Sequence, residues 1–584
     1  MIGPAALPEA AAMPASAASP ASAASPATAA SPASARPVDL LIVGAGFAGL
    51  YMLHKARCLG LSAQVVEAAA GVGGTWYFNR YPGARVDIQS LEYSFGFDDA
   101  LQQDWHWTER YAGQPELLRY ANHVADRFGL RDGILLNTRV SGAAFDEARQ
   151  CWQVQAESGQ SDTGQSDTTA AGQPQAWSAR FLVMASGPLS TPNLPAFPGL
   201  DSFAGPVHHT ARWPQHPVDF TGLRVAVVGT GSSAVQAIPV IARQARALTV
   251  FQRTATYAVP AHNGPLDTDL ESRIKADYPG FRARNRQMRG GFGSESPPNP
   301  GSADAATPAE RQARFEERWQ RGGFSLLGAF DDLLLNLRSN ALAAEFVRGK
   351  IRDAVTDPAT ARLLSPQHTI GCKRLCVDTG YYETFNQPHV RLVDVSQQPI
   401  EHFTPGGLRA GGQDFAFDAL VLATGFDAMT GTLMRLDLRG RGGVTIQQKW
   451  AAGPLNHLGL MVAGFPNLFN IAGPGSSSAF TNVIVSIEHH VEWIADCIAH
   501  LDRQGLATIE PTVEAETAWV AHVNAVAAST VLLSCNSWYL GANIPGKPRM
   551  FMPLVGFPPY VARCAAVAAN GYAGFSLHAR QAGA

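Results

Sequence analysis

A glycine-rich turn at residues 44–49 could hold the pyrophosphate of a dinucleotide. The apolar run 39–43 before it is too short for a helix and predicts a buried parallel strand, and a helix-like stretch follows. In that setting backbone amides and the helix N-terminus can bind phosphate. Glu67 lies 23 residues after Gly44, where a carboxylate can accept hydrogen bonds from a ribose diol. The predicted contacts are Gly44, Gly46, Phe47, Ala48, Gly49 and Glu67.

The same pattern recurs after a second predicted strand, 224–228, with one informative change. Arg253 lies 24 residues after Gly229, at the place where the first copy carries an acid. A guanidinium can bind a 2′-phosphate through two hydrogen bonds, whereas a carboxylate would repel it, so this site should prefer NADP. A surface arginine and solvated helix-start residues are the alternatives. The predicted contacts are Gly229, Thr230, Gly231, Ser232, Ser233, Gln236, Arg253 and Thr254.

Two nucleotide sites imply two cofactors, and a glycine-rich stretch at 71–76 indicates the identity of the first. Such a stretch lets the backbone approach a large flat ligand closely, which favours FAD. The apolar segments 182–187 and 420–425 each end in a small residue and a glycine, and strands of this kind can return beneath a dinucleotide.

Segment 203–213 resembles the F-x-G-x-x-x-H-x-x-x-W fingerprint of Baeyer-Villiger monooxygenases. Its fixed positions are Phe203, Gly205, His209 and Trp213. Segments 73–87, 373–374, 425–427, 537–539 and 543–547 are also similar to that family, most closely to its phenylacetone monooxygenase group. The resemblance covers roughly residues 38–578.

The resemblance implies an activity and a catalytic pair. In this family NADPH reduces FAD, the reduced flavin forms a C4a-peroxide with O₂, and this species attacks a ketone to give an ester or lactone. Arg374 matches the active-site arginine, and a guanidinium is always charged and offers a planar fork of donors. Asp87 matches the carboxylate that orients it. Without the family context, both would be read as members of structural ion pairs.

The resemblance also implies cofactor and substrate contacts. Lys373 joins Arg253 at the 2′-phosphate, and Thr75, Trp76 and Tyr93 join the FAD contacts. His209 is tied to cofactor handling and domain motion, not to proton transfer. The loop 473–483 resembles the wall of the ketone pocket, with Phe480 and Val483 where leucine and methionine are expected, so the cavity should have a different shape. The predicted pocket residues are Ser478, Ala479, Phe480 and Val483.

Other functions fit less well. A disulfide reductase would need a cysteine pair beside the first turn, but residues 44–87 contain only Cys58. Flavin N- and S-oxygenases have a fingerprint in which lysine follows the last aromatic residue, whereas Pro214 follows Trp213 here. They and an uncoupled NADPH oxidase remain the alternatives. A non-enzymatic NADP sensor would be expected to lose FAD contacts or Arg374.

Composition excludes further classes. The 45 basic and 48 acidic residues give a net charge of −3, which argues against nucleic-acid binding. No apolar run reaches the ~18 residues that a spanning helix needs. The seven scattered cysteines fit no disulfide framework, which predicts a reducing compartment and a cytoplasmic protein. The pairs 208–209 and 489–490 are histidines without a third ligand at a telling spacing, so no metal is expected.

The predicted fold is α/β, with two Rossmann-like dinucleotide-binding domains and a helical insertion in the NADP domain. We expect a ketone and O₂ as substrates and a monomer or weak oligomer. Residues 1–36 are an Ala/Pro/Ser tail that cannot fold, and 158–175 form a long hairpin loop. The predicted divisions are 37–191 with 427–584 for FAD, 192–267 with 368–426 for NADP, and 268–367 for the insertion.

Overall fold

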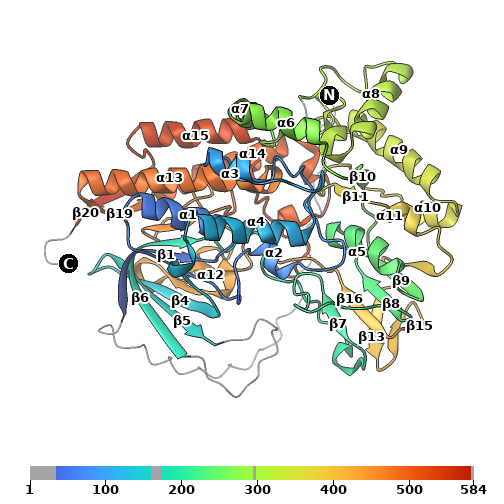
Figure 1. The fold of residues 1–584 in the computed structure, drawn as a ribbon, viewed down its shortest axis with the longest axis horizontal. Helices are drawn as coiled ribbons and strands as arrows, with labels where there is room; N and C mark the ends of the chain where they lie inside the picture. Colours follow the sequence, from blue (N-terminus) through green and yellow to red (C-terminus); the bar gives the residue numbers. More distant parts are fainter. Residues whose placement is uncertain (1–34, 160–172, 294–296, 581–584) are drawn as a thin grey trace, which may run out of the picture.

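The computed structural model describes residues 35–159, 173–293 and 297–580. Almost all of the predicted tail, most of the predicted hairpin loop and residues 294–296 of the predicted insertion lie outside these residues. The chain builds two sheets covered by helices, with a separate group of helices beside the second sheet (Figure 1). The predicted α/β class is confirmed.

The first sheet contains the first glycine turn. Its strand order is β17-β4-β5-β6-β1-β2-β3, and β18 pairs with the carboxyl half of β6. The strands β18, β6, β1, β2 and β3 are parallel neighbours, and residues 40–42 in the carboxyl half of β1 are fully buried, as expected for a strand covered on both faces. The bounds are β1 Arg36–Val43, β2 Ala63–Val66, β3 Ile134–Leu135, β4 Thr138–Asp146, β5 Cys151–Ser158, β6 Gln173–Met184, β17 Asp437–Arg439 and β18 Leu468–Asn470.

Helices from both ends of the chain cover this sheet. The long helix α13 (Val483–Gln504), drawn in orange, lies beside the blue α1 (Phe47–Cys58) in Figure 1. The C-terminal part of the chain therefore returns to the sheet that residue 36 begins. The other elements of this part are α2 Thr75–Phe78, α3 Asp99–Asp104, α4 Gln114–Arg127, α12 Ile446–Lys449, α14 Val513–Ala528, α15 Phe557–Ala569, β19 Leu506–Pro511 and β20 Phe575–Ala579.

The second sheet is parallel and contains the second glycine turn. Its order is β12-β9-β8-β16-β7, and helix α5 (Ser232–Ala242) connects β8 to β9. A three-stranded antiparallel meander lies between β12 and β16 in the sequence. The bounds are β7 Val207–His209, β8 Arg224–Val228, β9 Ala247–Gln252, β12 Val390–Asp394, β13 Ile400–Thr404, β14 Gly407–Ala410, β15 Gln413–Ala416 and β16 Ala419–Leu422.

The group of helices is bracketed by a pair of short parallel strands, β10 (Ala258–Pro260) and β11 (Cys376–Asp378). The chain leaves the second sheet through β10 and returns through β11, so the residues just before β11 lie close to the second nucleotide turn. The helices between them are α6 Thr268–Ala276, α7 Tyr278–Arg286, α8 Pro308–Arg321, α9 Leu337–Ala354 and α10 Pro358–Leu364, and α11 (Tyr381–Thr384) follows β11.

One prediction about the cysteines is wrong. Cys372 and Cys535 form a disulfide with an S–S distance of 2.04 Å, across a sequence separation of 163 residues. The spacing of the cysteines could not reveal it, because only the folded chain brings these two segments together. The remaining five cysteines are free.

Candidate active site

The first glycine turn has the shape of a dinucleotide cradle. Gly44 has φ +107°, and a Cβ there would lie 2.8 Å from the carbonyl oxygen of Ala185. Helix α1 begins directly after Gly46, and within the described ranges no side chain caps it. The carboxylate of Glu67 accepts a hydrogen bond from the N–H of Ala45, with 2.6 Å between Oε2 and N. Four lone-pair sites on that carboxylate also allow it to accept from a ribose, so these residues fit FAD.

The second turn repeats this geometry. Gly229 has φ +117°, and a Cβ there would lie 2.5 Å from the carbonyl oxygen of Ala423. At Gly231 a Cβ would meet no atom within 4 Å, so the start of α5 faces open space that phosphate oxygens can reach. The Thr230 hydroxyl donates to the carbonyl of Thr254 at 2.7 Å and fixes the turn against the end of β9.

A cluster of positive charge lies beside the second turn. Burial and the nearby charge of Arg253 lower the pKa of Lys373. Burial and the charge of Lys373 lower the pKa of His368 to about 4. Over the described part of the chain, neither Arg253 nor Lys373 forms an ion pair with a carboxylate. Two cations without an acidic partner fit a doubly charged phosphate, the group that distinguishes NADP from NAD.

Arg374 and Asp87 are joined as a bidentate pair, although 287 residues separate them. Arg374 Nε donates to Asp87 Oδ2 at 2.7 Å, and Nη2 donates to Oδ1 at 3.0 Å. About a quarter of each side chain is exposed, 27% and 26%. Burial acts to lower the pKa of Arg374, but the charge and hydrogen bonds of Asp87 outweigh it, so this pKa lies above its usual range. The guanidinium is thus a permanent, oriented cation.

The predicted pocket loop contacts the same guanidinium. Arg374 Nη1 donates to the backbone carbonyl of Ala479 at 3.1 Å. The Phe480 ring lies 4.6 Å from that of Tyr539 and stacks on Phe551 at 6.1 Å, measured between ring centroids. The Ser478 hydroxyl lies 2.9 Å from that of Ser476, and Val483 begins α13 directly after the loop. The fold therefore brings the charged pair and the predicted pocket residues together.

Comparison with known proteins identifies the family. Residues 41–278 match the pyridine nucleotide-disulphide oxidoreductase family. A Baeyer-Villiger monooxygenase of Pseudooceanicola batsensis is 41% identical over 91% of this chain and 95% of its own length. This chain belongs to the Baeyer-Villiger monooxygenase family. The resemblance predicted from the sequence is confirmed, and so is the assignment of an NADPH-dependent flavoprotein monooxygenase with FAD and NADP as cofactors.

Two further relatives show the range of this family. A phenazine N-monooxygenase of Lysobacter antibioticus is 40% identical over 92% of this chain and 97% of its own length. The solved structure of an oxidized steroid monooxygenase bound to NADP is 48% identical, covers 93% of this chain and 100% of that chain, and has a TM-score of 0.86.

The Baeyer-Villiger fingerprint lies at the edge of the second sheet. His209 ends β7 and lies 3.1 Å from the hydroxyl of Thr424 through Nε2, while its Nδ1 accepts from the N–H of Ala211. Burial lowers the pKa of His209 to about 4, so the ring is neutral near pH 7. At Gly205 a Cβ would lie 2.3 Å from the Asp418 carbonyl oxygen, and the backbone N–H of Trp213 donates to the backbone carbonyl of Phe78. These are packing and positioning contacts, and none of them reaches Arg374.

Two predicted cofactor contacts have different surroundings. Gln236 is a predicted contact of the second nucleotide, through its backbone or its side chain. In the structure its Oε1 accepts from the Tyr81 hydroxyl at 2.8 Å and its Nε2 donates to the Arg85 carbonyl at 3.0 Å. It thereby joins α5 to the segment that carries Asp87. The Phe47 ring packs against the aromatic core, 5.5 Å from Phe95. Helix periodicity alone could not distinguish these inward directions from ligand contacts.

The remaining predicted FAD contacts lie beside the first turn. The ring nitrogen of Trp76 donates to the Tyr93 hydroxyl at 3.2 Å. Thr75 is exposed at the start of α2, immediately after Gly74, whose neighbour Gly73 donates its N–H to the Ala45 carbonyl at 3.0 Å. The two predicted NADP serines begin α5: Ser232 lies 3.4 Å from the sulfur of Cys376, and Ser233 interacts with Tyr81.

Sequence reasoning missed several neighbours of the site. The Phe324 ring, from the inserted helices, lies 4.9 Å from the Arg374 guanidinium carbon. No sequence signal marks this phenylalanine. Arg374 also interacts with the hydroxyl of Tyr539. The amino group of Lys547 binds Asp427 Oδ1 and the Ala428 carbonyl, each at 2.7 Å. The similarity of segments 425–427 and 543–547 to the family could have suggested this last pair.

Within residues 35–159, 173–293 and 297–580, no three or more His, Cys, Asp or Glu side chains are arranged around a common metal position. Over the same residues, every helix is too short or too polar to cross a bilayer.

Proposed function

We propose that Arg374 is the catalytic residue of a ketone-oxygenating reaction that gives esters or lactones and uses NADPH and O₂. The observation that carries the proposal is the position of its guanidinium, which is held by Asp87 and also donates to the Ala479 carbonyl in the pocket loop. When bound, FAD supplies the electron transfer and the activation of oxygen. The chain's contribution is a fixed cation next to the pocket, where it can stabilise negative charge on oxygen.

Asp87 acts as the residue that orients Arg374. Its two carboxylate oxygens accept from Nε and Nη2, which leaves Nη1 directed at the pocket loop. A bidentate pair fixes the plane of the guanidinium as well as its place. We assign cofactor binding to the two glycine turns, with Glu67 at the FAD ribose and with Arg253 and Lys373 at the NADP 2′-phosphate.

The test is product analysis with the purified, FAD-loaded protein. NADPH should reduce the flavin under anaerobic conditions, and turnover in air with linear, cyclic and aryl ketones should give esters or lactones. Arg374→Ala should keep flavin reduction and lose ester formation, because the NADP contacts are unchanged. Arg273→Ala is the matched control, since this exposed arginine lies in α6, outside the proposed site. Normal ester formation by Arg374→Ala would refute the assigned role.

Oxygenation of ring nitrogen is the second candidate. It is favoured by the 40% identity to a phenazine N-monooxygenase over almost the whole of both chains. A phenazine included in the same panel decides between the two, because N-oxide without ester would support nitrogen oxygenation, and ester without N-oxide would support the ketone reaction.

The assignment of domains belongs to the same proposal. We assign 37–191 with 427–584 to FAD, 192–267 with 368–426 to NADP, and 268–367 to the insertion. The return of α13 to α1 supports the first assignment, and the pairing of β10 with β11 supports the last. We further propose a cytoplasmic monomer or weak oligomer, which light scattering and fractionation of the producing cells can test.

A further inference from the structure

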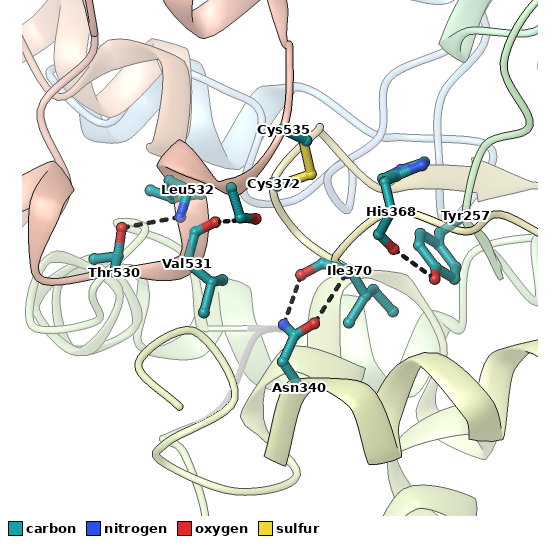
Figure 2. Close-up of a disulfide and its surroundings, with 10 residues drawn as sticks. Tyr257, Asn340, His368, Ile370, Cys372, Thr530, Val531, Leu532 and Cys535 are labelled. Carbon is teal, nitrogen blue, oxygen red and sulfur yellow. Dashed lines mark hydrogen bonds between the residues drawn. A yellow bond between two sulfur atoms is a disulfide. The ribbon is translucent and has the colours of Figure 1, made fainter. Parts of the chain in front are cut away.

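The disulfide joins two segments that both lead to Arg374. Cys372 is buried and lies two residues before Arg374 in the sequence. Cys535 is only partly buried and lies four residues before Tyr539, which interacts with the guanidinium. In Figure 2 the disulfide joins two segments. One is the loop that carries His368 and Ile370, and the other is the turn that carries Val531 and Leu532.

The inserted helices hold the first segment on its other side. Asn340 of α9 donates its side-chain N–H to the Ile370 carbonyl at 2.8 Å and accepts from the Ile370 N–H at 3.1 Å (Figure 2). The turn at 530–535 has a weaker attachment to the insertion, in which the Val531 N–H donates to the Leu334 carbonyl at 2.9 Å. Cys535 itself is flanked by the exposed residues Ser534 and Asn536. Val531 and Leu532 are buried, so the disulfide is the covalent anchor of the exposed end of this turn, residues 533–536.

We propose that the Cys372–Cys535 disulfide is a reversible clamp that holds the segment bearing Tyr539 in place beside Arg374. The proposal rests on the proposed catalytic role of Arg374. With the clamp closed, the arginine segment and the Tyr539 turn move as one unit, and Phe480 of the pocket packs on that turn through Tyr539. With the clamp open, Arg374 keeps its bonds to Asp87, but the segment bearing Tyr539 is no longer tied covalently to the arginine segment.

Opening proceeds by thiol–disulfide exchange with a dithiol. A dithiol thiolate attacks the sulfur of Cys535, the more accessible of the two, and expels the Cys372 thiolate. The second thiol of the reagent then displaces Cys535 and closes a cyclic disulfide. The protein gains two electrons and two protons, and the dithiol is oxidised. Disulfides in reducing compartments are rare and usually transient, which agrees with a bond whose one sulfur is accessible.

The expected consequence is a loss of coupling between NADPH consumption and ester formation. The NADP contacts at Arg253 and Lys373 and the Arg374–Asp87 pair do not depend on the turn, so NADPH oxidation should continue. A small displacement of a residue that positions the substrate can reduce the rate of the chemical step by about 100-fold. We expect the ester formed per NADPH consumed to fall by about tenfold or more when the clamp opens.

The experiment compares the FAD-loaded protein as purified, the same protein treated with dithiothreitol, and Cys535→Ser. A maleimide should label five thiols in the denatured, untreated protein and seven after reduction. Hydrogen exchange at 531–540 should accelerate in the reduced protein and in Cys535→Ser. Both should lose coupling, and dithiothreitol should change Cys535→Ser no further. Cys58→Ser, which removes an exposed free thiol, is the matched control and should respond to dithiothreitol as the wild type does.

The outcomes distinguish a failure of the disulfide clamp from a failure of the proposed ketone oxygenation. Seven reactive thiols without reductant would overturn the clamp, and so would reduction that leaves both the exchange at 531–540 and the coupling unchanged. Faster exchange with unchanged coupling would also overturn it, because the bond would then be only structural. If no ketone gave an ester in either redox state, the proposed function would fail, while the thiol count and the exchange rates would still report on the bond.

Discussion

Replacement of Arg374 by lysine tests geometry separately from charge. The variant keeps a positive charge, but one ammonium cannot reproduce the three directed hydrogen bonds to Asp87 Oδ1, Asp87 Oδ2 and the Ala479 carbonyl. Hydrogen bonds to charged groups contribute about 1.5–3 kcal/mol each. The loss of one or two, partly replaced by the lysine, should raise the barrier by about 2–4 kcal/mol, which slows ester formation by about 30- to 1,000-fold.

The assay separates the two half-reactions. Anaerobic stopped-flow measurement of flavin reduction by NADPH should give nearly the wild-type rate for Arg374→Lys, because Arg253 and Lys373 are unchanged. Ester formed per NADPH consumed, measured in air with the best ketone of the panel, should fall sharply. Arg273→Lys serves as the control for a conservative change at an exposed site. If Arg374→Lys formed ester as fast as the wild type, the argument from the oriented guanidinium would be wrong.

Three further predictions concern the second nucleotide site, acid and the disulfide. Arg253→Ala should raise KM for NADPH by about 10- to 100-fold, through the loss of one charge-assisted contact, and leave KM for NADH unchanged; equal loss for both would argue against phosphate binding. Burial lowers the pKa values of His209 and His457 to about 4, whereas the same histidines in the unfolded chain take up protons near pH 6.5. Acid therefore favours the unfolded chain, and the free energy of unfolding should decrease from pH 6.5 towards pH 4 by up to about 3 kcal/mol for each ring. Urea titrations at several pH values measure this, and a flat profile would contradict it. Reduction of the Cys372–Cys535 bond should lower the free energy of unfolding by up to about 5 kcal/mol, because it closes a loop of 163 residues, and denaturation with and without dithiothreitol measures the difference.

The nucleotide turns were predictable because their signals are local. A buried strand, a glycine that must adopt a positive φ, and a helix start follow one another within a few residues at Gly44 and again at Gly229. The residue that ends the next strand then distinguishes the two sites. The sheet, the turn and the charge at Glu67 or Arg253 are each encoded in a short window.

The charged pair and the disulfide were not predictable in this way. Arg374 and Asp87 carry no mutual signal in one sequence, and only the family resemblance connected them. Cys372 and Cys535 lacked even that connection, and seven cysteines permit many pairings. The side-chain direction of Gln236 was unpredictable for a different reason, since its amide is bonded to Tyr81 and Arg85, which lie on a segment far from α5 in the sequence.

The pocket loop contacts Arg374 through its backbone, so the side chains of the loop can change without changing this contact. The contact is made by the backbone carbonyl of Ala479, whereas we propose that Phe480 and Val483 face the ketone through their side chains. Substitutions at these two positions can reshape the cavity without removing the hydrogen bond. The cation is fixed elsewhere, by Asp87 and by the return of the chain into β11. On the proposed roles, a single catalytic geometry can serve several ketones, because the residues proposed to distinguish one ketone from another are not the residues that hold the charge.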